Sequence, residues 1–144
     1  MLDSKSFNSV LVDLGNQDEE FKVALDQIIK FIVLKFNNTE ELQEEIADYD
    51  SIYQIIIKDI NFNFWLKISH GSIIYKKGIN KDAAFKVKYT KDILIKILKR
   101  ELYGTDAYMK ALIQVDGNLS DGLRYIKLFR LFMKYLNNGF KKLK

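Results

Sequence analysis

The sequence predicts an α+β fold, because segments with two different hydrophobic periods occupy separate parts of the chain. Apolar residues recur every three or four positions over roughly the first fifty residues and again near the carboxyl end, which is the period of amphipathic helices. From residue 51 the period shortens to two, as in strands with one buried face. The chain has 144 residues, of which 48% are hydrophobic, enough to bury one core. We therefore expect a single domain over residues 1–144.

Three helices are expected in the amino-terminal part, residues 1–50. Apolar residues on one helix face indicate the first, and we expect Gly15 to end it in a left-handed cap. The second begins in an acidic run, which favours a helix amino end, and continues to Phe36. The third is short and acidic and is expected to cover residues 40–49 after a Thr39 cap.

Residues 51–136 are predicted to hold the sheet, a short helix and the closing helix. Three antiparallel strands form a meander, in which an exposed His70 occupies the turn between the second and third, and a fourth strand follows. Their ranges are 51–58, 62–69, 72–77 and 83–89.

The period changes twice more before the end of the chain. Thr90 can cap a helix over residues 91–102, and period two returns over 109–117, which predicts a fifth strand. The closing helix is expected over residues 123–136, followed by a basic tail, 137–144.

Two phrases occur in an order that points to a known family. FWLKISHGSI at residues 64–73 resembles the Trp-bearing strand and turn of the sterol carrier protein 2 (sterol-binding) domain family. The segment 92–119 resembles that family's helix, Gly-containing loop, strand and turn before the last helix. The resemblance covers residues 45–136. It implies a five-stranded, mainly antiparallel sheet covered on one face by helices, with an apolar tunnel between them that holds a lipid or acyl chain.

The residues themselves place apolar side chains on two facing surfaces. Alternation puts six on one sheet face: Leu66, Ile68, Phe85, Val87, Ile113 and Val115. The closing helix is expected to turn Leu123, Ile126, Phe129 and Met133 toward that face, beside a second apolar stripe, Tyr125, Leu128, Phe132 and Tyr135. The candidate lipid-binding residues are the six sheet residues with Leu123, Ile126, Phe129, Phe132 and Met133.

Three interpretations remain open for the second apolar stripe of the closing helix. It packs against neighbouring elements, it lines a lipid cavity, or it docks on a partner or an anionic membrane. We favour the cavity, because aromatic residues lie on both facing surfaces and Met133 suits an adaptable apolar pocket. Arg124, Lys127 and Arg130 are then expected to contact an anionic headgroup.

These observations predict a non-catalytic, cytoplasmic lipid-binding or lipid-transfer protein that holds an acyl chain, acyl-CoA or isoprenoid. The alternative is a protein-protein interaction or dimerisation module with a fully packed, ligand-free core. A net charge of +4 favours anionic partners, such as a transient membrane contact, whereas we do not expect nucleic acid. The chain has no cysteine, and we expect no disulfide, metal, cofactor or catalytic residue.

Overall fold

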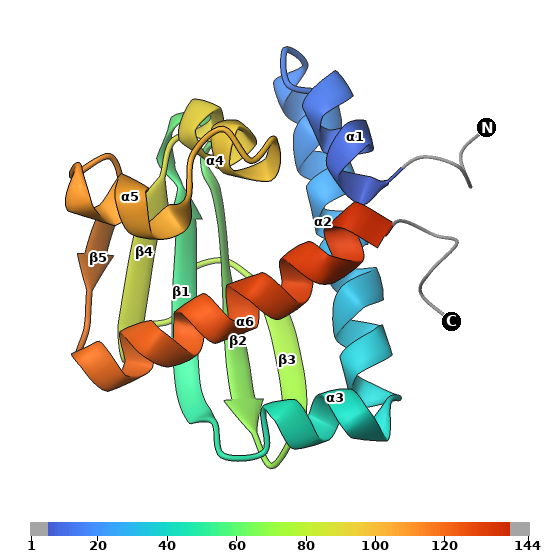
Figure 1. The fold of residues 1–144 in the computed structure, drawn as a ribbon, viewed down its shortest axis with the longest axis vertical. Coiled ribbons are helices and arrows are strands. Elements are labelled where there is room, and N and C mark those ends of the chain that lie inside the picture. The colour runs from blue at the N-terminus through green and yellow to red at the C-terminus, as the bar shows by residue number, and fades with distance from the viewer. Residues whose placement is uncertain (1–5, 139–144) are drawn as a thin grey trace.

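Helices cover one face of a five-stranded sheet in the computed structural model of the chain, which describes residues 6–138 (Figure 1). The strands are β1 (Asp50–Ile57), β2 (Phe62–Ser69), β3 (Ser72–Lys77), β4 (Phe85–Tyr89) and β5 (Gln114–Asp116). The helices are α1 (Phe7–Asp13), α2 (Asp18–Asn37), α3 (Glu40–Glu45), α4 (Lys91–Leu98), α5 (Gly104–Met109) and α6 (Leu119–Asn138), and the 3₁₀ turn η2 (Lys58–Ile60) joins β1 to β2.

The strand order is β3-β2-β1-β4-β5, with β1 and β4 parallel and the other neighbours antiparallel. The predicted α+β class and mainly antiparallel sheet are therefore confirmed. The parallel pair arises because the connection over residues 78–84 crosses the open face of the sheet before β4 begins (Figure 1). Gln54 holds this crossing segment: its amide nitrogen donates to the Gly78 carbonyl at 3.0 Å, and its side-chain oxygen accepts from the Asn80 N–H at 2.8 Å.

Alternation along the strands sends one set of side chains into the core. Tyr53 is opposite Leu66 on β2 and Phe85 on β4, and all three are buried. The helices close this face: α6 runs diagonally across the sheet from the β5 edge, and α2 lies along the β3 edge (Figure 1). Two hydrogen bonds join the Asn37 side chain to the Ile73 backbone and so tie α2 to β3.

The fifth strand is much shorter than the sequence predicts. Residues 104–109 form α5, and Ala111 adopts a left-handed φ of 58°. The chain therefore takes up the extended conformation of a strand only from Gln114. The apparent alternation over 109–117 therefore combines the end of a helix, a turn and a short strand. Met109 and Ala111, predicted on one strand face, are both exposed.

Several predicted helix ends are also wrong. The helix after Thr90 ends at Leu98, since Arg100 adopts a left-handed φ of 62°, and α3 ends at Glu45. Gly15 has no positive φ; its close approach to the Ile95 side chain explains the glycine instead. The Thr90 cap is confirmed, because its hydroxyl accepts from the Ile93 N–H. Residues 139–144 of the predicted basic tail lie outside the described part of the chain.

Candidate functional site

Contacts at its first turns fix the position of α6. The Asn118 side chain accepts from the Asp121 N–H at 2.8 Å and caps the helix. The Asp121 carboxylate accepts from the Ser51 hydroxyl at the start of β1, and the Tyr49 hydroxyl donates to the Arg124 carbonyl at 2.8 Å. The amino end of α6 is thus tied to the chain that enters the sheet.

The buried face of α6 is centred on the second predicted stripe, and the first stripe lies at its border. Leu128, 2% exposed, lies at its centre, with Tyr125, Phe132 and Leu136 above and below at helical spacing. The prediction that Leu123 faces the sheet is wrong: this side chain is 58% exposed. α6 is therefore rotated about its axis relative to the predicted orientation. The two apolar stripes have nearly equal spacing, so either could face the sheet, and burying the second stripe, which has more aromatic residues, removes more apolar surface from water.

An apolar cavity of about 90 Å³ lies between the sheet and the helices. Its walls come from the sheet, the amino-terminal helices, α4 and α6 from its second turn onward. The lining residues are Leu11, Leu25, Ile29, Ile32, Ile55, Ile57, Phe64, Leu66, Tyr89, Leu94, Leu98, Tyr125, Leu128, Phe129, Phe132 and Leu136. No charged side chain belongs to this lining, so the cavity wall favours an apolar molecule over an ion.

Three predicted lipid-binding residues, Leu66, Phe129 and Phe132, line this cavity. The others do not. Ile68, Phe85, Val87 and Ile113 are buried elsewhere in the core, and Val115, Ile126 and Met133 are half-buried.

Sequence reasoning missed the contribution of α2 and α4 to the cavity. Leu25, Ile29 and Ile32 repeat at helical spacing on α2, and Leu94 and Leu98 do so on α4. This periodicity in the sequence predicts that these residues face the core. It did not indicate which core residues border an internal space, because that depends on how the helices are placed over the sheet.

The cavity is narrower than the predicted tunnel. Its volume is below the ~150 Å³ of an apolar protein cavity that can hold benzene, and an acyl chain is larger than benzene. The lining must therefore separate before such a chain can enter. Because α6 contributes five of the lining residues, its displacement would enlarge the cavity most directly.

Two tyrosines connect the sheet to α6 at the cavity wall. The hydroxyls of Tyr89, at the end of β4, and Tyr125 are 2.7 Å apart and share a hydrogen bond. Burial raises the pKa of both tyrosines, so both hydroxyls stay protonated at neutral pH. The rings border the cavity, and Phe129 packs edge-on against both.

We expect Tyr89→Phe to destabilise the fold by about 1–3 kcal/mol, since the Tyr125 hydroxyl would stay buried without its partner. Replacing both tyrosines by phenylalanine should cost less than the sum of the two single changes, because no hydroxyl is then left unpaired. Urea unfolding of the four proteins measures this double-mutant cycle. Strictly additive losses would show that the hydrogen bond contributes nothing.

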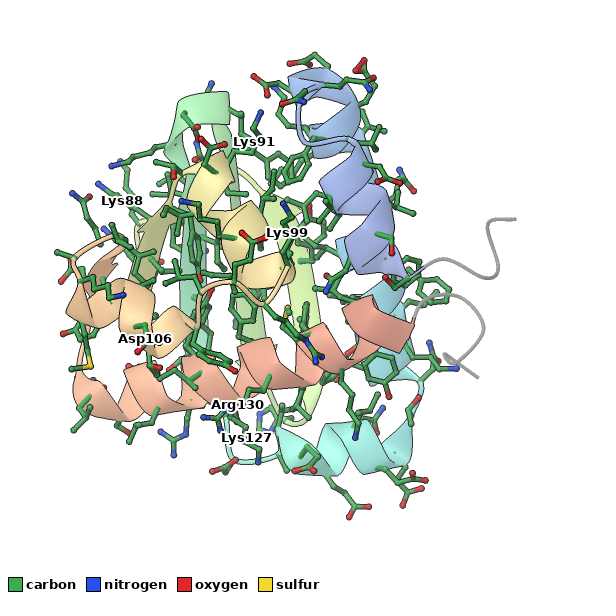
Figure 2. The ribbon with its side chains drawn as sticks, turned by 45° about the horizontal axis from the view of Figure 1, so that its top comes forward. Lys88, Lys91, Lys99, Asp106, Lys127 and Arg130 are labelled. Carbon is green, nitrogen blue, oxygen red and sulfur yellow. The ribbon has the colours of Figure 1, made fainter. Side chains whose placement is uncertain are left out.

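The predicted headgroup cations lie outside the cavity lining, and two of them already have carboxylate partners. Arg124 is 3.6 Å from Asp48, and Lys127 is 3.3 Å from Glu45. Arg130 is exposed and, within residues 6–138, has no carboxylate at ion-pair distance. Figure 2 shows Lys127 and Arg130 on the same side of α6.

Other residues considered from the sequence lie away from the cavity. His70 is exposed in the turn between β2 and β3, with φ 52° followed by 74° at Gly71. Trp65 is half-buried on the opposite sheet face. Among residues 6–138, no cluster of three or more acidic or histidine side chains is arranged to hold a metal ion. In the same range, no helix combines the length and apolarity that a membrane span requires.

A mixed five-stranded sheet with helices on one face and an apolar cavity beneath them defines the class of sterol-carrier-type α+β domains. The chain belongs to the SCP-2 sterol transfer family, whose model matches residues 30–130, more than half of the chain. This match supports lipid binding or transfer as the general function and confirms the resemblance recognised in the sequence. No curated protein matches the chain.

Solved structures share the fold at low sequence identity. Sterol carrier protein 2 like 2 from Aedes aegypti superposes with a TM-score of 0.56 at 13% identity, over 72% of this chain and 94% of that one. For UbiJ-SCP2, a ubiquinone synthesis protein, the TM-score is 0.57 at 14% identity, over 76% of this chain and 96% of that one.

An enzyme structure also contains this fold. The sec-alkylsulfatase Pisa1 from Pseudomonas sp. matches with a TM-score of 0.50 at 22% identity over 69% of this chain. The match corresponds to 15% of the length of the sulfatase. At such identities the likeness shows the fold alone.

Proposed function

We propose that this protein is a non-catalytic lipid carrier that holds one acyl chain, acyl-CoA or isoprenoid between the sheet and α6. The observation that carries the proposal is the apolar cavity, which is bordered by apolar and aromatic side chains from both layers. Membership of a sterol transfer family supports the same general function. One similar structure is that of a palmitated sterol carrier-like protein, SCP2L2 from Aedes aegypti, which supports an acyl chain as the ligand class.

The proposed mechanism is exchange without a covalent step. α6 moves away from the sheet, the apolar chain enters, and the lining closes around it. A C16 chain would gain on the order of 10 kcal/mol gross from leaving water, before the costs of ordering the chain and widening the cavity reduce the gain.

We propose that an anionic head stays outside the cavity, where Arg130 is free to contact it. Arg124 and Lys127 would first have to leave Asp48 and Glu45. Both ion pairs are solvent-exposed to a large extent, so exchanging a carboxylate partner for a phosphate costs little. Since a cysteine-free chain gains nothing from an oxidising compartment, we place this activity in the cytoplasm.

The alternative is an interaction or dimerisation module whose interior holds no ligand. The small volume of the cavity favours it. Native mass spectrometry of the purified chain, followed by organic extraction, separates the two functions. We expect the carrier to retain one lipid per chain, released on extraction. A lipid-free dimer that takes up no added fatty acid would support the alternative.

A further inference from the structure

β5 is a strand with one unpaired edge, and large apolar side chains are exposed beside it. It is last in the strand order, so within residues 6–138 only β4 pairs with it. Figure 1 shows α5, β5 and the first turn of α6 together at the edge of the sheet farthest from α2. We call the surface formed by residues 104–123 the β5 edge. An unpaired strand edge is a template for backbone pairing with another chain.

The β5 edge concentrates exposed apolar residues. Met109 is 81% exposed and Leu119 is 78% exposed. The exposed set is Tyr108, Met109, Leu112, Leu119 and Leu123. Single exposed apolar residues need no explanation, but a concentrated set points to an interaction surface.

The charges at the β5 edge are of both signs. Asp106 is on α5, Lys110 follows its last residue, and Asp116 of β5 is in register with Lys86 of β4. Within residues 6–138, none of the four forms an ion pair. Balanced charges do not attract a strongly anionic or cationic partner. They do suit a second copy of the same surface, since a two-fold contact can place each sign opposite the other.

We propose that two copies of the chain pair antiparallel through the β5 edge, about a two-fold axis at Val115, so that their five-stranded sheets become continuous. Only this register overlaps all three residues of β5. It puts Val115 opposite the partner's Val115 and Asp116 opposite the partner's Gln114. A register centred on Asp116 would instead put two carboxylates directly opposite each other, which is destabilising.

The same axis brings the apolar side chains of the two copies together. Val115 is in register with the buried Val87, so it lies on the sheet face that the helices cover. α5 and the start of α6 lie on that face (Figure 1), and across the axis they approach their counterparts. Three paired residues exchange few hydrogen bonds, so backbone pairing sets the register and apolar burial supplies most of the stabilisation. Residues 104–123 match the roughly 20 residues per side of a stable interface.

Pairing would hold the amino end of α6 over the sheet. Leu119 and Leu123 lie in the proposed contact, whereas the cavity lining on α6 begins at Tyr125. Movement of α6 away from the sheet would then come from its carboxyl-terminal part. This inference goes beyond the proposed function, because pairing requires no ligand in the cavity.

Sedimentation velocity of the full chain over about 1–500 µM measures the pairing. The parent chain should convert from monomer to dimer as its concentration rises. The triple variant Met109→Ser/Leu119→Ser/Leu123→Ser should raise the dimer dissociation constant about 100-fold or more. The matched control, Val23→Ser/Leu34→Ser, removes two side chains that are 63% and 60% exposed on α2 and should leave the constant unchanged.

A single introduced cysteine tests the register. The chain has no cysteine, so Val115→Cys would place one thiol of each copy at the axis. Directly opposite residues of antiparallel strands have Cα atoms about 4.5–5.5 Å apart, within the range of a disulfide. Mild oxidation should therefore link Val115→Cys pairs at least about tenfold faster than Leu34→Cys pairs, whose thiol is on the exposed side of α2.

Three results would overturn the inference. They are a parent chain that stays monomeric at the highest concentration, a triple variant that dimerises like the parent, and equal linking rates for the two cysteine variants. Organic extraction of the same samples reports separately on the carrier function. A monomer that retains lipid would reject pairing and leave carriage intact, whereas a lipid-free dimer that the triple variant abolishes would support pairing and reject carriage.

Discussion

Phe129→Asp should reduce uptake of a fluorescent fatty acid by more than about 100-fold. Phe129 borders the cavity and packs against Tyr89 and Tyr125 at ring distances of 6.5 and 6.1 Å. A carboxylate in this apolar wall would have to remain hydrated, and its desolvation by an entering chain would cost several kcal/mol. Phe129 is half-buried, so the new side chain can turn toward solvent and the fold should survive. Fluorescence titration with far-UV circular dichroism of the same samples measures both effects.

Leu123→Asp is the matched control for that substitution. It places the same charge on the same helix at a position outside the cavity lining, where the parent side chain is already exposed. Uptake from vesicle-free solution should therefore remain close to the parent value. Phe129→Leu should also retain uptake, since it keeps the wall apolar. Equal losses in both Asp variants would mean that charge on α6, and not the cavity, controls binding.

The change of hydrophobic period was enough to predict most of the fold. β2 to β4 lie within the predicted ranges and β1 is displaced from its range by one residue, because alternation between apolar and polar residues has one consistent solution on a half-buried sheet. The His70–Gly71 turn was predicted for the same reason, as a two-residue connection between strands. These are local signals, and they determine local structure.

Positions set by long-range packing were not predictable in this way. Residues 109–117 alternate in sequence, but the left-handed backbone at Ala111 ends the helical segment before β5. On α6, two apolar stripes compete for the sheet, and contacts with Tyr49 and Ser51 help to set the rotation. Both outcomes depend on residues far away in the chain, whose positions a single sequence does not specify.

The position of the cavity is also set by long-range packing, so only part of its lining was predicted. Leu66, Phe129 and Phe132 were identified because the sheet and the last helix were expected to face each other. The walls from α1, α2 and α4 come from helices whose positions over the sheet have no local signature. Apolar periodicity thus predicts which residues are buried, whereas the position of an internal space depends on how imperfectly the layers fit together.

Gly117→Ala should destabilise the protein by about 2–5 kcal/mol. Gly117 joins β5 to the α6 cap with φ 147°, a region that residues with a side chain rarely adopt. A Cβ atom would lie 2.6 Å from Phe85 Cδ1 and 2.9 Å from the Ala84 carbonyl oxygen. Phe85 is held in the core against Tyr53 and Tyr125, so it cannot yield without moving the wall that faces α6. Urea unfolding would measure the loss.

Gly104→Ala provides the comparison within the same chain. Gly104 begins α5 without a positive φ, and no atom lies within 4 Å of the position that a Cβ would take. This change should be neutral or slightly stabilising, because alanine favours a helix more than glycine does. The contrast isolates the close approach at Gly117 from any general effect of glycine replacement. If both variants unfold at the same urea concentration as the parent, the β5–α6 turn can shift to accept a Cβ atom at Gly117. The start of α6 is then not held in one position over the cavity by this turn.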